Sequence, residues 1–148
     1  MLHRVALRAM TIPLWVLLGF AAWTLITLFT TVGVYRWSRI LTKRAAIADF
    51  VVDEPHGEDW YRRAMRAHAN CLENLPVYTA ITVVIVATGI QSSVIDGLAI
   101  TLLIARVLQT ITHIAFKQTN TVVGFRFAFF LTQVICMLGM GITVALRA

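Results

Sequence analysis

The stretch TIPLWVLLGFAAWTLITLFTTVGVYRW, residues 11–37, decides the fold class because it is apolar over most of its length and Arg36 is its single charged residue. About 20 apolar residues are enough for a helix to cross a bilayer. Its large aromatic residues lie toward both ends, as at membrane interfaces: Trp15, Trp23, Tyr35 and Trp37. The stretch is too long for the apolar part of a signal peptide and shows no small-residue cleavage motif. We therefore expect a retained membrane span.

Three further apolar stretches follow, and each is long enough to cross a membrane. The second covers about 75–90 within a helix that starts near residue 58, and the third and fourth cover 94–116 and 122–146. Hydrophobic residues make up 59% of the 148 residues, against roughly 45–50% in soluble domains. The sequence therefore predicts an all-α membrane protein, a bundle of four transmembrane helices in one domain, 1–148.

The basic residues lie beside the apolar stretches, which argues against a nucleic-acid partner although the net charge is +6. Seven of the 13 lie between the first and second stretches: Arg36, Arg39, Lys43, Arg44, Arg62, Arg63 and Arg66. They surround a polar loop, about 40–60, in which Pro55 and Gly57 mark a turn. The opposite side has only Arg4, Arg8 and Arg147. The positive-inside rule then predicts an integral, multi-pass protein with this loop in the cytoplasm and both termini on the other side.

The two cysteines do not form a recognisable pair. Cys71 and Cys136 fall in different predicted helices and belong to neither a CxxC motif nor a zinc-ligand spacing. We expect no metal site and no disulfide framework, and we interpret Cys71 as a small packing residue.

Two polar stripes interrupt the apolar helices. Arg62, Arg66, Asn70 and Glu73 follow an i, i+4, i+8, i+11 spacing, which lines them along one helix face. Pro76 frees a backbone carbonyl one turn earlier and permits a kink beyond this stripe. Because charge at membrane depth is costly, these side chains should face protein or water.

The third stretch carries the second stripe, in which Gln109, Thr110 and His113 follow Arg106 at i+3, i+4 and i+7. Structural ion pairs and interhelical hydrogen bonds would explain both stripes equally well for an arbitrary membrane protein.

The residues Arg66-Ala67-His68-x-Asn70-x-x-Glu73-x-x-Pro76, followed by Ala105-Arg106-Val107, resemble the MAPEG family of membrane-associated proteins in eicosanoid and glutathione metabolism. The resemblance extends over nearly the whole chain and is to a bacterial-type member, which implies a bacterial inner membrane. It also implies that the four-helix protomer forms a homotrimer, with glutathione as co-substrate held between protomers near the cytoplasmic side.

By this resemblance Arg66, Asn70 and Glu73 would contact glutathione through a cation, an amide and an anion. Arg106, Gln109 and His113 are the polar positions of the third helix, where His113 replaces a tyrosine of one branch. Its alternative role is an interhelical hydrogen bond.

The family's activating arginine lies near the start of the fourth helix, where Arg126 is the single arginine. A second family arginine, at the end of the first helix, corresponds to Arg36 or Arg39. The expected chemistry is a glutathione thiolate, stabilised by Arg126, that attacks a lipophilic electrophile or reduces a peroxide.

Other functions remain open at this stage. Ala69 stands where animal members have a further arginine, which favours a non-catalytic scaffold or lipid-binding protein with the same fold. A transporter would use the intramembrane charges, but the sequence lacks inverted repeats. Four phenylalanines in the fourth stretch either border a substrate groove or simply contact lipid: Phe125, Phe127, Phe129 and Phe130.

Overall fold

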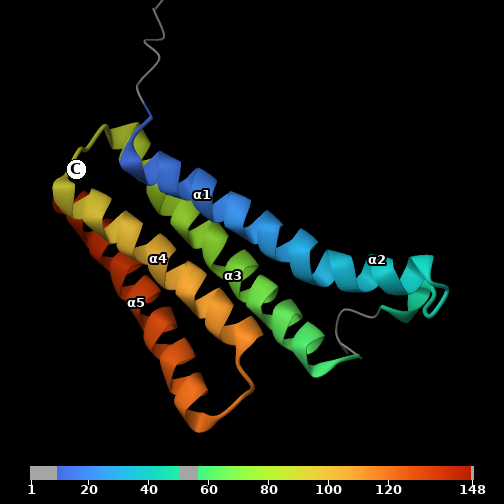
Figure 1. The fold of residues 1–148 in the computed structure, drawn as a ribbon. Coiled ribbons are helices and arrows are strands. Elements are labelled where there is room, and N and C mark those ends of the chain that lie inside the picture. Colours follow the sequence, from blue (N-terminus) through green and yellow to red (C-terminus); the bar gives the residue numbers. More distant parts are fainter. Residues whose placement is uncertain (1–9, 51–56, 148) are drawn as a thin grey trace, which may run out of the picture.

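The computed structural model describes residues 10–50 and 57–147. Within these ranges the regular structure is entirely helical, and four helices are long and apolar enough to cross a membrane. They run over Ile12–Leu41, Asp59–Thr88, Ser93–Ala115 and Asn120–Ala145. The predicted four-helix membrane fold is confirmed (Figure 1). Arg4, Arg8 and Pro55 lie outside the described residues.

The first long helix has three parts: α1 (Ile12–Thr27), a π-helical segment η1 (Leu28–Gly33) and α2 (Val34–Leu41). Pro13 lies in the first turn of α1, where its missing N–H costs no hydrogen bond. The π-helical segment contains Thr30 and Thr31, whose hydroxyls donate to backbone carbonyls one turn earlier at 2.7 and 2.5 Å. The wider turns of a π-helix and these hydroxyl bonds locally change how the helix is wound. This change was not predicted from the sequence.

Local signals account for the ends of α3 (Asp59–Thr88), α4 (Ser93–Ala115) and α5 (Asn120–Ala145). The residue after α3 is Gly89, whose φ of 68° is the left-handed conformation common at helix ends. Thr119 precedes α5 and its hydroxyl accepts from the Val122 N–H at 3.3 Å, an N-cap bond. α3 stays helical through Pro76.

The helices alternate in direction, so that the connections gather at the two ends of the bundle (Figure 1). α4 and α5 share the most extensive contact, while α1 packs against α3 and α4. The main core is apolar and includes Phe20, Cys71, Tyr78, Leu102 and Met140, all nearly inaccessible.

The outer surface is also apolar, as expected of a protein that lipid or other protein covers. Leu18, Phe29, Val83 and Leu138 are each more than half exposed. This pattern reverses the polar exterior of a soluble bundle and agrees with a membrane location.

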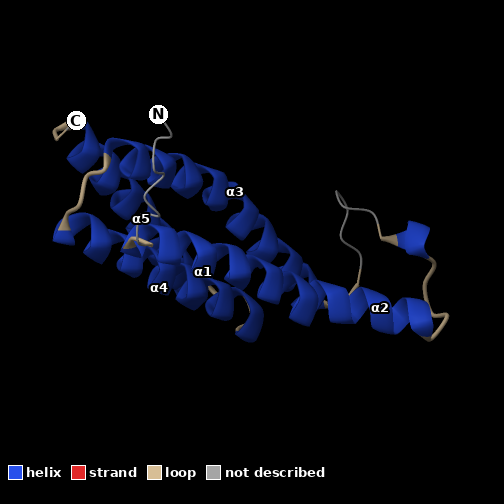
Figure 2. Cartoon of the chain, turned by 90° about the horizontal axis from the view of Figure 1, so that it is seen from above, coloured by secondary structure: helices blue, strands red, loops and turns tan. Residues whose placement is uncertain are grey.

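The end of α2 projects beyond the other helices (Figure 2). A second, smaller core attaches it to the start of α3, where the rings of Tyr35 and Tyr61 stack with centroids 4.0 Å apart. A short 3-10 helix, Ile47–Asp49, follows in the connection to α3. This junction lies at the same end of the bundle as the turn between α4 and α5.

Candidate functional site

A pocket of about 210 Å³ opens at the end of the bundle where α3 begins, α4 ends and α5 begins. Its lining is predominantly cationic and comprises Asp59, Arg62, Arg63, Arg66, His113, Gln118 and Arg126. The alternating helix directions bring these residues together from positions far apart in the chain. We call this feature the basic pocket. It contains three of the predicted site residues, Arg66, His113 and Arg126.

Arg126 forms part of the wall and is held by the end of α4. Its Nη2 lies 3.4, 3.3 and 3.3 Å from the carbonyl oxygens of Thr112, His113 and Phe116. The last carbonyls of a helix lack partners within the helix and favour a nearby cation. The turn before α5 is short, so Arg126 can reach them. Arg126 is only 6% exposed, and these three backbone contacts hold its guanidinium at the pocket wall.

Arg63 reaches the same helix end from α3. Its Nη2 donates to the Ile114 carbonyl at 3.3 Å, and its Nη1 pairs with the Asp59 carboxylate. The Arg63 side chain is 13% exposed. Two arginines from different helices thus bind the carbonyls that end α4, which concentrates positive charge beside the pocket.

His113 and Asn70 connect α4 to α3 beneath the pocket. The Asn70 Nδ2 lies 3.3 Å from the His113 Nε2. Because an amide nitrogen can only donate, Nε2 is the acceptor, and a neutral His113 carries its proton on Nδ1. Nδ1 is buried without a hydrogen-bond partner among the described residues.

A chain of side-chain amides extends from Arg126 into the core. Gln109 donates to the Arg126 carbonyl at 3.1 Å, Gln133 donates to Gln109 at 3.0 Å, and Asn74 donates to Gln133 at 3.4 Å. These three hydrogen bonds link α3, α4 and α5. They fix the position of the Arg126 backbone along the axis of α4. Gln109 therefore supports the pocket from behind without lining it.

The structure separates other predicted site residues from the basic pocket. Arg106 is 1% exposed and lies in the core with its Cζ 5.4 Å from the centre of the Phe20 ring. Its Nε and Nη2 have no hydrogen-bond partner in the part of the chain that is described. Glu73 is exposed and is absent from the pocket lining formed by the described residues.

Arg36 and Arg39 belong to the junction between α2 and α3. Arg36 Nε donates to the Tyr61 hydroxyl at 2.8 Å, whereas Arg39 pairs with Glu58 at 3.1 Å. Within one chain both guanidinium groups are therefore engaged outside the basic pocket.

The comparisons with known proteins agree with the residue pattern. The model of the MAPEG family matches residues 12–146, almost the whole chain. The chain belongs to the MAPEG family. No curated protein and no solved structure matches it. MAPEG proteins include glutathione transferases and peroxidases as well as non-catalytic members. Family membership and four apolar helices together identify an integral membrane protein.

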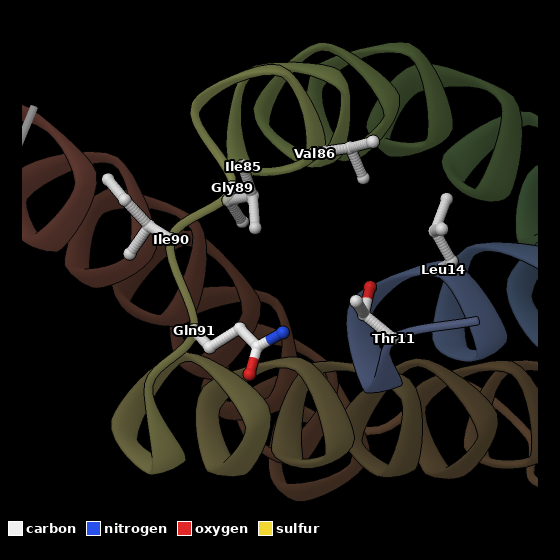
Figure 3. A pocket seen from close by; sticks show the side chains of 7 residues that line it. All are labelled: Thr11, Leu14, Ile85, Val86, Gly89, Ile90 and Gln91. Carbon is white, nitrogen blue, oxygen red and sulfur yellow. The ribbon is translucent and has the colours of Figure 1, made fainter. Parts of the chain in front are cut away.

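This MAPEG chain has a second pocket, about 340 Å³, at the opposite end of the bundle (Figure 3). It lies between the start of α1 and the end of α3 and is lined by Thr11, Leu14, Ile85, Val86, Gly89, Ile90 and Gln91. None of these is charged. No group of three or more metal-ligating side chains occurs among the described residues either. Charge-dependent chemistry is therefore best served by the basic pocket.

Four residues of the pocket lining were not predicted as site residues: Asp59, Arg62, Arg63 and Gln118. Gln133, which supports the pocket through Gln109, was not predicted either. The position of Gln133 could have been predicted, because it follows Arg126 by seven residues and therefore shares its helix face. The role of Arg63 could not, because Arg63 does not lie on the polar stripe of Arg62 and Arg66. Only the position of the end of α4 explains its role.

Proposed function

We propose that this MAPEG protein is a membrane-bound, glutathione-dependent transferase or peroxidase that acts on lipophilic electrophiles. The observation that carries the proposal is the basic pocket, which gathers Arg62, Arg63, Arg66 and Arg126 beside His113. Glutathione has two carboxylates, one ammonium group and a thiol. Arginine binds carboxylates through paired, charge-assisted hydrogen bonds, so a cluster of arginines suits this ligand.

Four residues in or beside the pocket take roles that follow from their positions. Arg66 binds a glutathione carboxylate, and His113 and the neighbouring Asn70 offer hydrogen-bonding groups to the peptide. Arg126 stabilises the thiolate, because a fixed cation favours the deprotonated sulfur. The fixed contacts of Arg126 with α4 suit this role, since a preorganised charge need not move during the reaction.

The reacting group is then the thiol of the bound glutathione. In transfer, the sulfur loses its proton, attacks an electrophilic carbon, and the leaving group departs with the bonding electrons. In peroxide reduction, two glutathione thiols are oxidised to one disulfide while the hydroperoxide becomes an alcohol and water. The apolar helix surfaces give lipophilic substrates access from the bilayer.

A homotrimer completes the proposed site. Counting about 20 residues back from the end of α3 at Thr88 places the start of the hydrocarbon layer near residue 69. Glu73 then lies about one turn inside the bilayer and is exposed on the protomer, which is costly against lipid. Another copy of the chain covers this face and supplies Arg36 or Arg39, while Glu73 meets the ligand's ammonium group.

The orientation follows the basic residues. The basic pocket and the connection between α2 and α3 lie on the cytoplasmic side of a bacterial inner membrane. An impermeant thiol reagent should then label a cysteine placed at Ala46 only from the cytoplasmic side.

The function is tested by purifying the protein and measuring glutathione binding and conjugation of a generic aryl halide. Arg126→Ala should lower kcat/KM about 100-fold or more, the scale for losing one preorganised charge. Arg147→Ala is the control, because it removes the same charge at the other end of the bundle and should leave turnover unchanged. No glutathione binding at millimolar concentration would refute the proposal.

A non-catalytic scaffold or lipid-binding protein is the second candidate. The contacts of Arg126 with three backbone carbonyls favour it, because they give this arginine a structural role that needs no ligand. It predicts that purified protein carries lipid or a partner and that Arg126→Lys and Arg126→Ala differ only in stability.

A further inference from the structure

Asp59 is the single acidic side chain in the described lining of the basic pocket. Its carboxylate pairs with Arg63 Nη1 and lies 3.6 Å from Arg62 Nη2. A carboxylate of the protein itself is thus bound where the pocket would bind a carboxylate of a ligand.

The two partners of this ion pair are held very differently. Arg63 is 13% exposed and is also anchored to the Ile114 carbonyl of α4. Asp59 is 61% exposed and lies in the first turn of α3, where its side chain can rotate into water without disturbing the helix. The Asp59 carboxylate already faces water, so it stays well solvated when it leaves the pair. An incoming anion can therefore displace Asp59, while Arg63 stays in place.

We infer that Asp59 occupies a carboxylate subsite of the basic pocket and that a ligand binds by exchanging its own carboxylate for that of Asp59 on Arg63. Before a ligand arrives, the pairing with Asp59 keeps the poorly solvated charge of Arg63 from being unpaired. It also makes Asp59 a specificity-determining residue. A ligand with one carboxylate can use the other arginines, whereas a ligand with two gains Arg63 only by displacing Asp59.

This inference rests on the proposed role of the basic pocket as an anion site, but not on thiol chemistry. The probes are therefore succinate, which has two carboxylates, and propionate, which has a methyl group in place of the second. Glutathione is measured in parallel. Binding to the purified full chain is followed by calorimetry at constant ionic strength.

Asp59→Asn should lower the Kd for succinate and for glutathione about fivefold, which corresponds to about 1 kcal/mol for a competing carboxylate that is itself exposed. The Kd for propionate should change less than twofold. Asp96→Asn is the matched control, because it makes the same change in the first turn of α4, at the opposite end of the bundle from the basic pocket. It should leave all three Kd values within twofold.

Asp59→Ser removes the same charge with a smaller polar side chain, so it repeats the test if the asparagine variant unfolds. Unchanged or weaker succinate binding in both Asp59 variants would overturn the inference, as would an equal gain in Asp96→Asn. Tighter succinate binding without any glutathione binding would support the exchange and refute the glutathione function. Glutathione turnover with no effect at Asp59 would do the reverse.

Discussion

Gln133 illustrates how one buried polar residue organises the end of the bundle. Its side chain is completely buried, and its amide joins Gln109 of α4 to Asn74 of α3. Its Nε2 also donates to the Phe129 carbonyl at 2.8 Å. A single residue therefore satisfies polar groups on three helices, and the position of Arg126 depends on it through Gln109.

Replacing Gln133 by leucine should destabilise the protein by about 1–2 kcal/mol, because the Asn74 amide and the Gln109 carbonyl oxygen lose their partner. The midpoint of thermal unfolding in detergent measures the effect. Gln91→Leu makes the same change in the exposed turn between α3 and α4 and should cost less than about 0.5 kcal/mol. Equal midpoints for the two variants would show that the amide chain does not stabilise the fold.

At the scale of elements, the junction between α2 and the start of α3 depends on a sharp turn at Gly57. Its φ of 128° is a conformation that residues with a Cβ rarely adopt. A Cβ there would also lie 2.5 Å from the Tyr35 hydroxyl oxygen. That hydroxyl accepts from the Glu58 N–H at 3.4 Å, so the turn and the stacked tyrosines form one unit.

Gly57→Ala should therefore destabilise the junction by about 1–3 kcal/mol, the cost of a strained backbone residue. Limited proteolysis of the connection and thermal unfolding should both detect the change. Gly124→Ala in α5 is the matched control, since its Cβ would meet no atom within 4 Å and alanine favours a helix. If both variants behaved alike, the turn would not constrain α2.

At the scale of the whole molecule, one chain leaves a carboxylate exposed among apolar side chains. Glu73 is exposed on α3, a helix of 30 residues and about 45 Å, and it lies about one turn inside the estimated edge of the bilayer. The exposed residues that follow it on α3 include Val77, Val83 and Val84. This exposed carboxylate is the basis for proposing the homotrimer.

Native mass spectrometry of the protein in detergent should show three copies, and Glu73→Gln should shift the population toward monomer. The reason is that the carboxylate would lose its partner on the neighbouring copy or on the ligand. Glu58→Gln makes the same change on the loop and should leave assembly unaltered. A monomeric wild-type protein, or identical populations in both variants, would contradict the trimer.

The polar stripe Arg62, Arg66, Asn70 and Glu73 shows where sequence reasoning reached its limit. Helical spacing placed the four residues on one face, and they do follow one side of α3. Arg62 and Arg66 line the basic pocket and Asn70 contacts His113, but Glu73 remains exposed. Periodicity defines a face of a helix, whereas the residues that a neighbouring helix covers depend on where that neighbour ends.

The sequence by itself determined the class of fold and the family. An apolar stretch of this length forms a helix in a bilayer, because a helix satisfies the hydrogen bonds of every backbone polar group within the stretch itself. Only the tertiary structure decided which polar residues meet. The end of α4 holds Arg63 at the Ile114 carbonyl and Arg126 at the His113 carbonyl, which places both arginines at the basic pocket. These contacts join residues far apart in the chain, and helix packing creates them without any local signal in the sequence.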